Sequence, residues 1–579
     1  MQALPECRHV WTVTIFEDDD MQEENKTSFM PPYGALPSRR QIEWYQREKM
    51  AFFHFGMNTF TSDEWGEGKA DPKNFCPEKV DCRQWIRSVK AAGFRAAILT
   101  AKHHDGFCLW PSRYTEYSIK NSPYKNGQGD IVREFTDACR EYGIKAGLYL
   151  SPWDRHEKTF GTAAYDDYYA GQLTELMSGY GKIYECWWDG AQSEKIHYDW
   201  GRYAYIIRNL QPECVIFGSL GATEYAESRW VGNESGYAGT PCWSTISPEY
   251  LRNEVPRVLN TGNPGASRFI PAEADTSIRP GWFYHKEQDD LIKSSSALFQ
   301  YWFTSVGSNA VMLLNIPPAP NGLLKERDVR NLLEAYRFER QTFAFNLAAG
   351  SEVSESSREE GHGGDQVLTE DDGFYRAKEG DASPVLTISF PTERCFDCFC
   401  IGEAIEYGQR VRHFKVEAFV QNEWKEILRA EGIGYKRAFR LEALNTEQVR
   451  ITIEDSMDEP VIRHIGVYKL PEECFPEEKR MKNASDLANG PSTRVHVQEK
   501  EIEVEFGGIF PFNTIRFNGE GVWEYEIQAF NGVRYETIYK NSCPNRDQTV
   551  SLPETQAYKM RMIAKGGMFR SPQIAVYDL

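Results

Sequence analysis

The first half of the chain alternates between short apolar runs and longer amphipathic stretches, and this alternation limits the possible fold more than any other feature. Eight apolar runs lie at residues 50–58, 96–104, 144–152, 183–189, 215–220, 229–234, 269–275 and 309–315. Between them, residues 82–92, 131–142, 166–180, 198–210 and 288–306 carry apolar side chains at helical spacing. Strands that alternate with helices predict parallel β/α units. Eight such units in about 300 residues predict a TIM-like (β/α)₈ barrel.

The composition changes after a last predicted helix at 329–344. Residues 350–383 are polar, and beyond them strands alternate with turn residues, which predicts an all-β region. This region is doubled, because 411–419, 424–427 and 465–468 resemble 522–530, 535–538 and 574–577. We therefore expect two β-sandwiches of jelly-roll type, which either bind sugar or only brace the barrel. The expected domains are an extension at 1–40, a catalytic barrel at 41–345, and β-sandwiches at 346–475 and 476–579.

Net charge and composition limit the kinds of partner that the protein can bind. The formal net charge of −19 disfavours nucleic acid and anionic membrane, which both need basic surface, and favours a neutral ligand. No apolar stretch reaches the roughly 18 residues of a membrane span. The 13 cysteines show no disulfide framework, so we expect mostly free thiols. The first forty residues do not resemble a secretory signal, which predicts a cytoplasmic protein unless a signal peptide has been removed, in which case the protein is periplasmic or secreted.

The fourth apolar run ends in Trp187, Trp188, Asp189 and Gly190. In a (β/α)₈ barrel the C-terminal end of each strand faces the active site, so Asp189 is a candidate catalytic carboxylate. Two tryptophans beside a carboxylate suit a sugar, whose C–H faces stack on indole. The alternative is that Asp189 caps the next helix, since Asp is a favoured N-cap residue.

Polar and aromatic side chains also gather at the ends of the other predicted strands. They are His54, Asn58, Asp63, Glu64 and Trp65 after the first, Lys102 to Asp105 after the second, Tyr149, Trp153 and Asp154 after the third, Glu234 after the sixth, and Glu273 and Asp275 at the seventh. His54 is either a core residue or a ligand. His103 and His104 point to opposite faces of a strand, so they do not both fill a core. With Asp105 they make an incomplete metal set, so we expect bonds to hydroxyl groups and neither a metal nor a cofactor.

Hydrolysis of a glycoside with retention needs two carboxyl groups about 5 to 5.5 Å apart. Asp189 and Glu234 end the fourth and sixth predicted strands, so they can converge across the barrel mouth. Glu273 is a rival proton donor and Glu64 a third candidate, and spacing alone does not rank them.

An ordered set of short motifs between residues 40 and 345 resembles the α-L-fucosidases of glycoside hydrolase family twenty-nine. The motifs are His54-Phe-Gly, Glu64-Trp65, Lys102-His-His-Asp-Gly-Phe107, Gly147-Leu-Tyr-Leu-Ser151 and Trp187-Trp-Asp189. The segments 229–237 and 271–282 also resemble the branch of that family that cleaves α-1,3 and α-1,4 linkages. No counterpart is assigned for the pocket arginine of some family members.

The resemblance implies a retaining exo-α-L-fucosidase that acts on fucosylated oligosaccharides or glycoconjugates. It implies Asp189 as nucleophile and Glu234 as acid/base. It implies sugar contacts from His54, Glu64, Trp65, His103, His104, Tyr149, Trp187 and Trp282. The competing hypotheses are an inactive carbohydrate-binding barrel and a metal-dependent hydrolase built on His103, His104 and Asp105.

Overall fold

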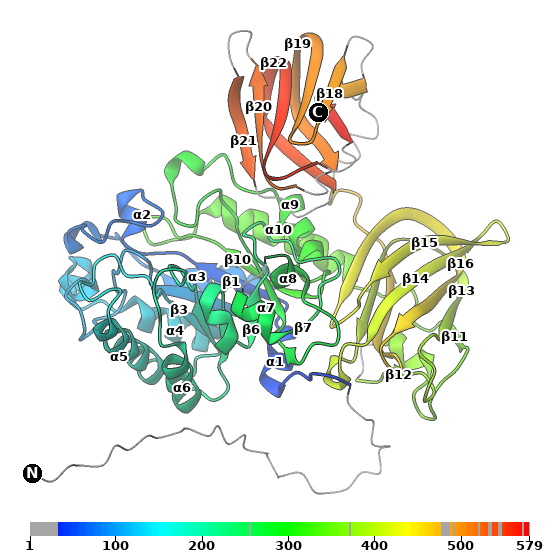
Figure 1. Cartoon of the computed structure of the whole chain (residues 1–579), viewed down its shortest axis with the longest axis horizontal. Coiled ribbons are helices and arrows are strands. Elements are labelled where there is room, and N and C mark those ends of the chain that lie inside the picture. The colour runs from blue at the N-terminus through cyan, green and yellow to red at the C-terminus, as the bar shows by residue number, and fades with distance from the viewer. Residues whose placement is uncertain are drawn as a thin grey trace, which may run out of the picture.

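Eight parallel strands close into a barrel in the computed structural model, which describes residues 33–253, 256–369, 372–475, 487–489, 493–518, 522–530, 535–541, 547–569 and 573–577 (Figure 1). The strands are β1 (Lys49–Phe53), β2 (Ala96–Lys102), β3 (Lys145–Leu150), β4 (Glu185–Trp188), β5 (Val215–Gly218), β6 (Ser228–Trp230), β9 (Ala272–Ser277) and β10 (Ala310–Asn315). Around the barrel they run β1-β10-β9-β6-β5-β4-β3-β2, and all neighbours pair in parallel. The predicted barrel is confirmed.

Helices follow the barrel strands, and most of them pack against the outer face of the barrel. They are α2 (Asn58–Thr61), α3 (Cys82–Ala91), α4 (Ile131–Tyr142), α5 (Ala163–Gly179), α6 (Trp200–Leu210), α7 (Pro248–Asn253), α8 (Pro256–Thr261), α9 (Ser295–Thr304) and α10 (Glu326–Phe343). Side-chain caps fix where several of them begin. Asp81, Asp130 and Asp199 each accept the backbone N–H three residues on, which satisfies a donor that the first helical turn leaves free.

Successive residues of each barrel strand serve two different cores. On β1, β2 and β4 the side chains of Phe52, Ile98 and Trp187 point into the barrel, while their neighbours Phe53, Leu99 and Trp188 pack against the helices. Both faces of each strand are therefore buried, which is why the strands read as continuous apolar runs.

The N-terminal ends of the barrel strands are closed by α1 (Arg39–Tyr45) and by the first of two β-rich units. Tyr45 stacks on Tyr435 with ring centroids 5.0 Å apart, and Glu48 forms an ion pair with Lys436. Ile405, in the short helix η7 (Ile405–Tyr407), belongs to the same buried cluster as the barrel interior. The predicted site residues lie at the opposite end, where the strands finish.

The first β-unit comprises β11 (Glu352–Glu355), β12 (Tyr375–Arg376), β13 (Val385–Glu403), β14 (Val411–Val420), β15 (Glu423–Glu431), β16 (Arg437–Ser456) and β17 (Val461–Tyr468). The second β-unit comprises β18 (Arg494–Gln498), β19 (Glu501–Asn518), β20 (Val522–Phe530), β21 (Tyr535–Asn541), β22 (Asp547–Gly567) and β23 (Ile574–Tyr577). In the first unit β13 pairs with β16 and β17, and β14 pairs with β15 and β16. In the second unit β19 pairs with β22 and β23, and β20 pairs with β21 and β22. The doubling in the sequence therefore extends to the strand pairing.

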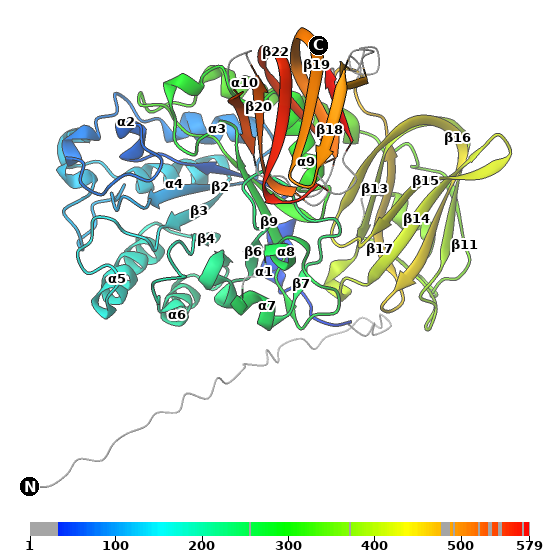
Figure 2. The ribbon, with the colours of Figure 1, turned by 45° about the horizontal axis from the view of Figure 1, so that its top comes forward.

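The two β-units relate differently to the barrel. Cys398, Cys400, Ala438 and Tyr468 of the first unit lie in the same hydrophobic cluster as the barrel and its helices. Each unit also has a core of its own, but none of the described residues of the second unit lies in the cluster of the barrel and its helices. The second unit stands over α9 and α10 (Figures 1 and 2). Burial raises the pKa of Tyr301 of α9, and the nearby phenols of Tyr237 and of Tyr539 in β21 add to this effect.

Some predicted boundaries were wrong. The first run was expected to reach residue 58, but β1 ends at Phe53 and α2 begins at Asn58. The sixth run was expected to reach 234, but β6 ends at Trp230 and Gly232, with φ 80°, turns the chain away. A small ribbon of β7 (Thr245–Ile246) and β8 (Arg268–Phe269) was not predicted.

Parts of two predicted domains lie outside the described residues: most of the extension at 1–40, and residues 476–486 at the start of the second expected β-sandwich. Of the helices in the described part of the chain, none has the length and apolar character to cross a membrane.

Candidate active site

Asp189 follows directly on β4, at the mouth of the barrel, with its side chain 26% exposed. Its Oδ2 accepts a 2.9 Å hydrogen bond from the Tyr149 hydroxyl, and its Oδ1 accepts one of 3.1 Å from the backbone N–H of Ala191. Gly190 follows with φ 73°, and a side chain there would collide with the carbonyl oxygen of Ser219. The next helix, α6, is capped by Asp199, so capping is not the role of Asp189.

Three histidines line the mouth beside Asp189, all buried. Each ring uses Nδ1 for a protein partner: His54 faces Asn315, His103 faces Asn58 and His104 faces Ser151. Burial lowers the pKa of all three, that of His54 to about 3. They are therefore neutral imidazoles at neutral pH, and their partners decide which nitrogen carries the proton.

The network around the histidines fixes these tautomers. The Asn315 amide nitrogen donates to Trp282 O, so its oxygen accepts from His54 Nδ1. The Ser151 hydroxyl donates to Trp153 O, so it accepts from His104 Nδ1. Both rings therefore present Nε2 as an acceptor, and His104 Nε2 lies 3.8 Å from Asp189 Oδ2.

His103 has the opposite arrangement. The Asn58 amide nitrogen donates to Glu64 O, and the same group lies 3.4 Å from His103 Nδ1. Nδ1 of His103 is therefore the acceptor, and its Nε2–H is a donor. Two acceptors and one donor at a single mouth suit the hydroxyl groups of a sugar.

Glu234 lies on the loop after β6, between Gly232 and Gly236, which both have positive φ. Its Oε2 accepts a 3.2 Å hydrogen bond from the indole of Trp282. Surrounding protein atoms raise its pKa, and the charges of Asp189 and Glu64 add to this effect, whereas the bond from Trp282 opposes it. Glu234 is thus a candidate proton donor at the mouth, close enough to Asp189 for the two charges to interact.

Glu64 holds a neighbouring loop in place. Its Oε2 accepts the backbone N–H of Trp282 at 2.9 Å, and its Oε1 lies 2.7 Å from His285 Nε2. The loop approaches so closely that a side chain at Gly281 would collide with the Glu64 carboxylate. This carboxylate therefore positions Trp282, the one side chain of the loop that reaches both Glu234 and, at 5.0 Å, the ring of His54. His285 was not predicted.

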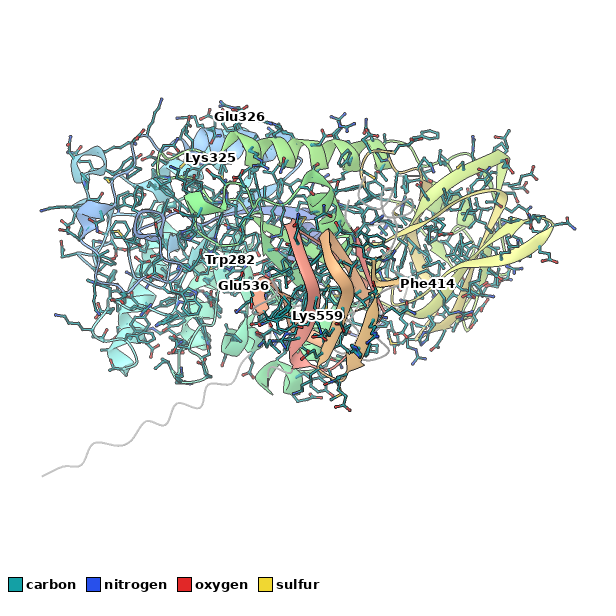
Figure 3. All side chains as sticks on the ribbon, turned by 90° about the horizontal axis from the view of Figure 1, so that it is seen from above. Trp282, Lys325, Glu326, Phe414, Glu536 and Lys559 are labelled. Atoms are coloured by element: carbon teal, nitrogen blue, oxygen red, sulfur yellow. The ribbon has the colours of Figure 1, made fainter. Side chains whose placement is uncertain are left out.

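Aromatic rings form the floor and the outer wall of the mouth. Trp187 stacks on Phe217 with centroids 4.0 Å apart and lies 5.5 Å from Tyr149. Trp65, 57% exposed, meets Trp153 edge to face at 6.0 Å, and Trp153 lies against His104. Figure 3 shows Trp282 on the barrel side of the molecule, with Phe414 of the first β-unit far along the long axis.

The remaining acids lie deeper. Glu273 and Asp275, both inward-facing on β9, are 0% and 3% exposed. Glu273 accepts from the Trp187 indole at 2.7 Å, and Asp275 accepts from the Trp230 indole at 2.9 Å. Burial raises the pKa of both carboxyls well above the usual range. Neither reaches the mouth as Glu234 does.

The metal hypothesis lacks a ligand set in the described part of the chain, where no three His, Cys, Asp or Glu side chains come together to hold an ion. His103 and His104 bond to Asn58 and Ser151, while Asp105 accepts the backbone N–H of Phe107.

Known proteins resemble this chain over the barrel and beyond it. A family model described as alpha-L-fucosidase matches residues 43–338. Alpha-L-fucosidase 1 of Arabidopsis thaliana is 38% identical over 465 residues, which cover 77% of this chain and 91% of that protein. A family 29 glycoside hydrolase fucosidase of Ruminococcus gnavus has been solved in complex with fucose. It is 31% identical to this chain with a TM-score of 0.73, and the match covers 78% of this chain and 98% of that chain. A family 29 glycoside hydrolase from an unknown rumen bacterium is 32% identical with a TM-score of 0.71, and the match covers 94% of this chain and 99% of that chain.

Proposed function

The chain belongs to the α-L-fucosidase family of glycoside hydrolases, and from this membership we propose that it releases terminal α-1,3- or α-1,4-linked L-fucose with retention of configuration. The substrates are branched fucosylated oligosaccharides or glycoconjugates. The fucose bound to the Ruminococcus gnavus relative supports the sugar, and the resemblance of 229–237 and 271–282 to the α-1,3/1,4 branch supports the linkage.

One observation carries the mechanism: two carboxyl groups with different surroundings share one mouth. Asp189 accepts hydrogen bonds from the Tyr149 hydroxyl and from the backbone N–H of Ala191, which hold its carboxylate at the end of β4. Glu234 is exposed at the mouth, where the surrounding protein atoms and the charges of Asp189 and Glu64 raise its pKa. An anchored carboxylate beside a carboxyl group with a raised pKa supplies the nucleophile and the proton donor that retaining hydrolysis needs.

In the first step, an oxygen of Asp189 forms a bond to the anomeric carbon while the bond to the leaving oxygen breaks. The proton of Glu234 passes to that oxygen, which leaves Glu234 ionised and the fucosyl group esterified to Asp189. In the second step, Glu234 takes a proton from water, and the resulting hydroxide attacks the anomeric carbon. Asp189 departs as a carboxylate, and two inversions give net retention.

The histidines and aromatic rings bind the sugar in this scheme. Nε2 of His54 and of His104 accept from sugar hydroxyls, and Nε2–H of His103 donates to one. Trp65, Tyr149, Trp187 and Trp282 supply rings against which C–H faces and the methyl group pack.

The test compares fucose release from Lewis-type trisaccharides with release from a linear 2-fucosyl glycan, and ¹H NMR records which anomer forms first. We expect release from the Lewis-type compounds at least about tenfold faster, a transition-state difference of about 1.4 kcal/mol, with the α anomer first. Preference for the linear glycan would overturn the linkage assignment, and β-fucose as first product would overturn retention.

A further inference from the structure

Two buried carboxyl groups face each other inside the barrel, beneath the candidate active site. Glu185 of β4 and Glu273 of β9 are 1% and 0% exposed and lie within hydrogen-bonding range of each other. They come from strands that do not pair, so the contact crosses the barrel interior. The proposed catalytic steps use neither group.

The partners of the two groups differ. Glu185 lies 3.6 Å from the Arg47 guanidinium and accepts the Trp44 indole N–H at 3.2 Å from each of its oxygens. Within the described part of the chain, no lysine or arginine forms an ion pair with Glu273. Its Oε1 accepts from Trp187, and its Oε2 is buried with no donor facing it. Each group accepts one indole N–H, so the positive charge of Arg47 is what favours the ionised form on Glu185 rather than on Glu273.

A shared proton explains the unpartnered oxygen. Two ionised carboxylates in contact would repel each other strongly in this interior, and a carboxylate has no hydrogen to donate. If Glu273 is a carboxylic acid, its Oε2–H donates to Glu185 and its Oε1 still accepts from Trp187. Burial and the charge of Glu185 raise the pKa of Glu273 well above the usual range, in agreement with this state.

We infer that Glu273 is a positioning residue which, as a neutral carboxylic acid, links Glu185 to the indole of Trp187 and so fixes the floor of the sugar pocket. The chain of contacts runs from Arg47 through Glu185 and Glu273 to Trp187. Trp187 lies against Tyr149, whose hydroxyl bonds to Asp189. The inference rests on the proposed function in taking Trp187 as part of the pocket.

Glu273→Gln tests this assignment, because an amide reproduces both bonds of a neutral acid: its oxygen accepts from Trp187 and its nitrogen donates to Glu185. We expect kcat and KM on an aryl α-L-fucoside within about threefold of wild type. Glu273→Met keeps the size of the side chain but removes both bonds, so KM should rise by about tenfold or more, with a smaller change in kcat.

A stability measurement tests the proton without using activity. An unfolded glutamate loses its proton near pH 4.5, whereas folded Glu273 keeps it to higher pH, so wild-type stability falls as the pH rises above that value. Glu273→Gln has no such loss. The apparent melting temperature of the variant should therefore match or trail wild type at pH 4.5 and gain on it by a few degrees at pH 7.

Three results would overturn the inference: a Gln variant that is inactive until azide restores turnover, which would make Glu273 a proton donor in catalysis; an unchanged KM in a folded Met variant; or a melting-temperature difference that does not change with pH. Failure of the proposed function is distinguishable, because wild type would then release no fucose while the stability comparison could still succeed.

Discussion

At the scale of single residues, side chains of the same chemical type at the barrel mouth have different roles because their neighbours differ. Asp189 has donors around it, Glu234 has acids near it, and Glu273 lies buried against another carboxylate. The same holds for the histidines, whose partners at Nδ1 decide whether Nε2 accepts or donates. Residue type alone therefore does not determine the role of these side chains.

Asp189→Asn should abolish nearly all turnover, because the amide is a poor nucleophile, while its oxygen and nitrogen keep the size of the side chain. We expect kcat to fall on the order of 10⁴-fold or more, with the melting temperature nearly unchanged. Asp167→Asn, in an exposed surface ion pair with Arg202, is the matched control and should behave as wild type. Wild-type turnover in Asp189→Asn would refute the nucleophile.

Glu234 should set the basic limb of the pH–rate profile. Its pKa is raised, so the proton needed for departure of the leaving group stays in place above pH 4.5 and is lost as the pH rises through the raised value. Glu234→Ala should slow natural substrates by about 10²- to 10⁴-fold, spare substrates with good leaving groups, respond to azide and lack the basic limb. If the pH–rate profile of Glu234→Ala keeps its basic limb, another residue is the acid/base.

Sequence reasoning found the strand-end side chains because barrel geometry brings those ends together. The loop role of Glu64 and the positions of His285 and Trp230 were not predicted. Glu64 and Trp282 are 218 positions apart, and no local pattern encodes a contact of that length. The burial of Glu273 could not be predicted from the sequence either, because it depends on the register of the barrel strands, which places this residue below Trp187.

At the scale of elements, the segment between β9 and α9 is held by a side chain that is distant in the sequence. Glu64 accepts the backbone N–H groups of Trp282 and Phe283 and contacts His285. Gly281 allows the close approach. The segment carries the indole that bonds to Glu234, so its position bears on the proposed proton donor.

Glu64→Ala should therefore weaken substrate binding and proton donation together. Loss of a hydrogen bond to a charged group costs about 1.5–3 kcal/mol, so kcat/KM should fall by roughly 10- to 100-fold. Glu67→Ala removes the same charge from an exposed position nearby and should change kcat/KM little. Equal kinetics for the two variants would show that the segment holds its position without Glu64.

The barrel strands and the helices α3, α4, α5, α6 and α10 were predicted to within about five residues, because both faces of the barrel strands are buried and these helices have apolar side chains at helical spacing. The helix expected at 288–306 begins only at Ser295, and α1, α2, α7, α8 and the long strands β13, β16, β19 and β22 were not predicted. Other errors fall where a glycine or a turn ends a strand early, as after Trp230, and in the two-residue strands β7 and β8. Pairs that short carry no periodicity, so their sequence does not differ from that of a loop.

At the scale of the whole molecule, the first β-unit has its own core but also shares buried clusters with the barrel. Tyr435 covers Tyr45, Ile405 enters the interior cluster, and Tyr468 lies in the outer one. The second β-unit keeps a separate core and meets the barrel at α9. The Arabidopsis thaliana relative matches 77% of this chain over 91% of its own length.

A chain that ends after residue 475 should therefore fold and retain most of its activity on a small aryl fucoside, with kcat/KM within about threefold of the full chain. A chain that ends after residue 345 exposes the apolar surface that the first β-unit covers and should aggregate. Soluble yield, light scattering and kinetics of the two truncated chains test these expectations. Full activity from the shorter chain would contradict the shared core, and aggregation of the longer one would contradict the independence of the second unit.

The two copies of the β-unit thus differ in what a substitution can disturb. Each copy has its own interior, but residues of the first copy also lie in the cluster of the barrel and its helices, so a substitution at those residues should affect both parts. Among the described residues of the second copy none lies in that cluster, so we expect this copy to tolerate change with less effect on the chemistry. Among related proteins we expect differences in carbohydrate binding and in domain composition to be concentrated in the second β-unit.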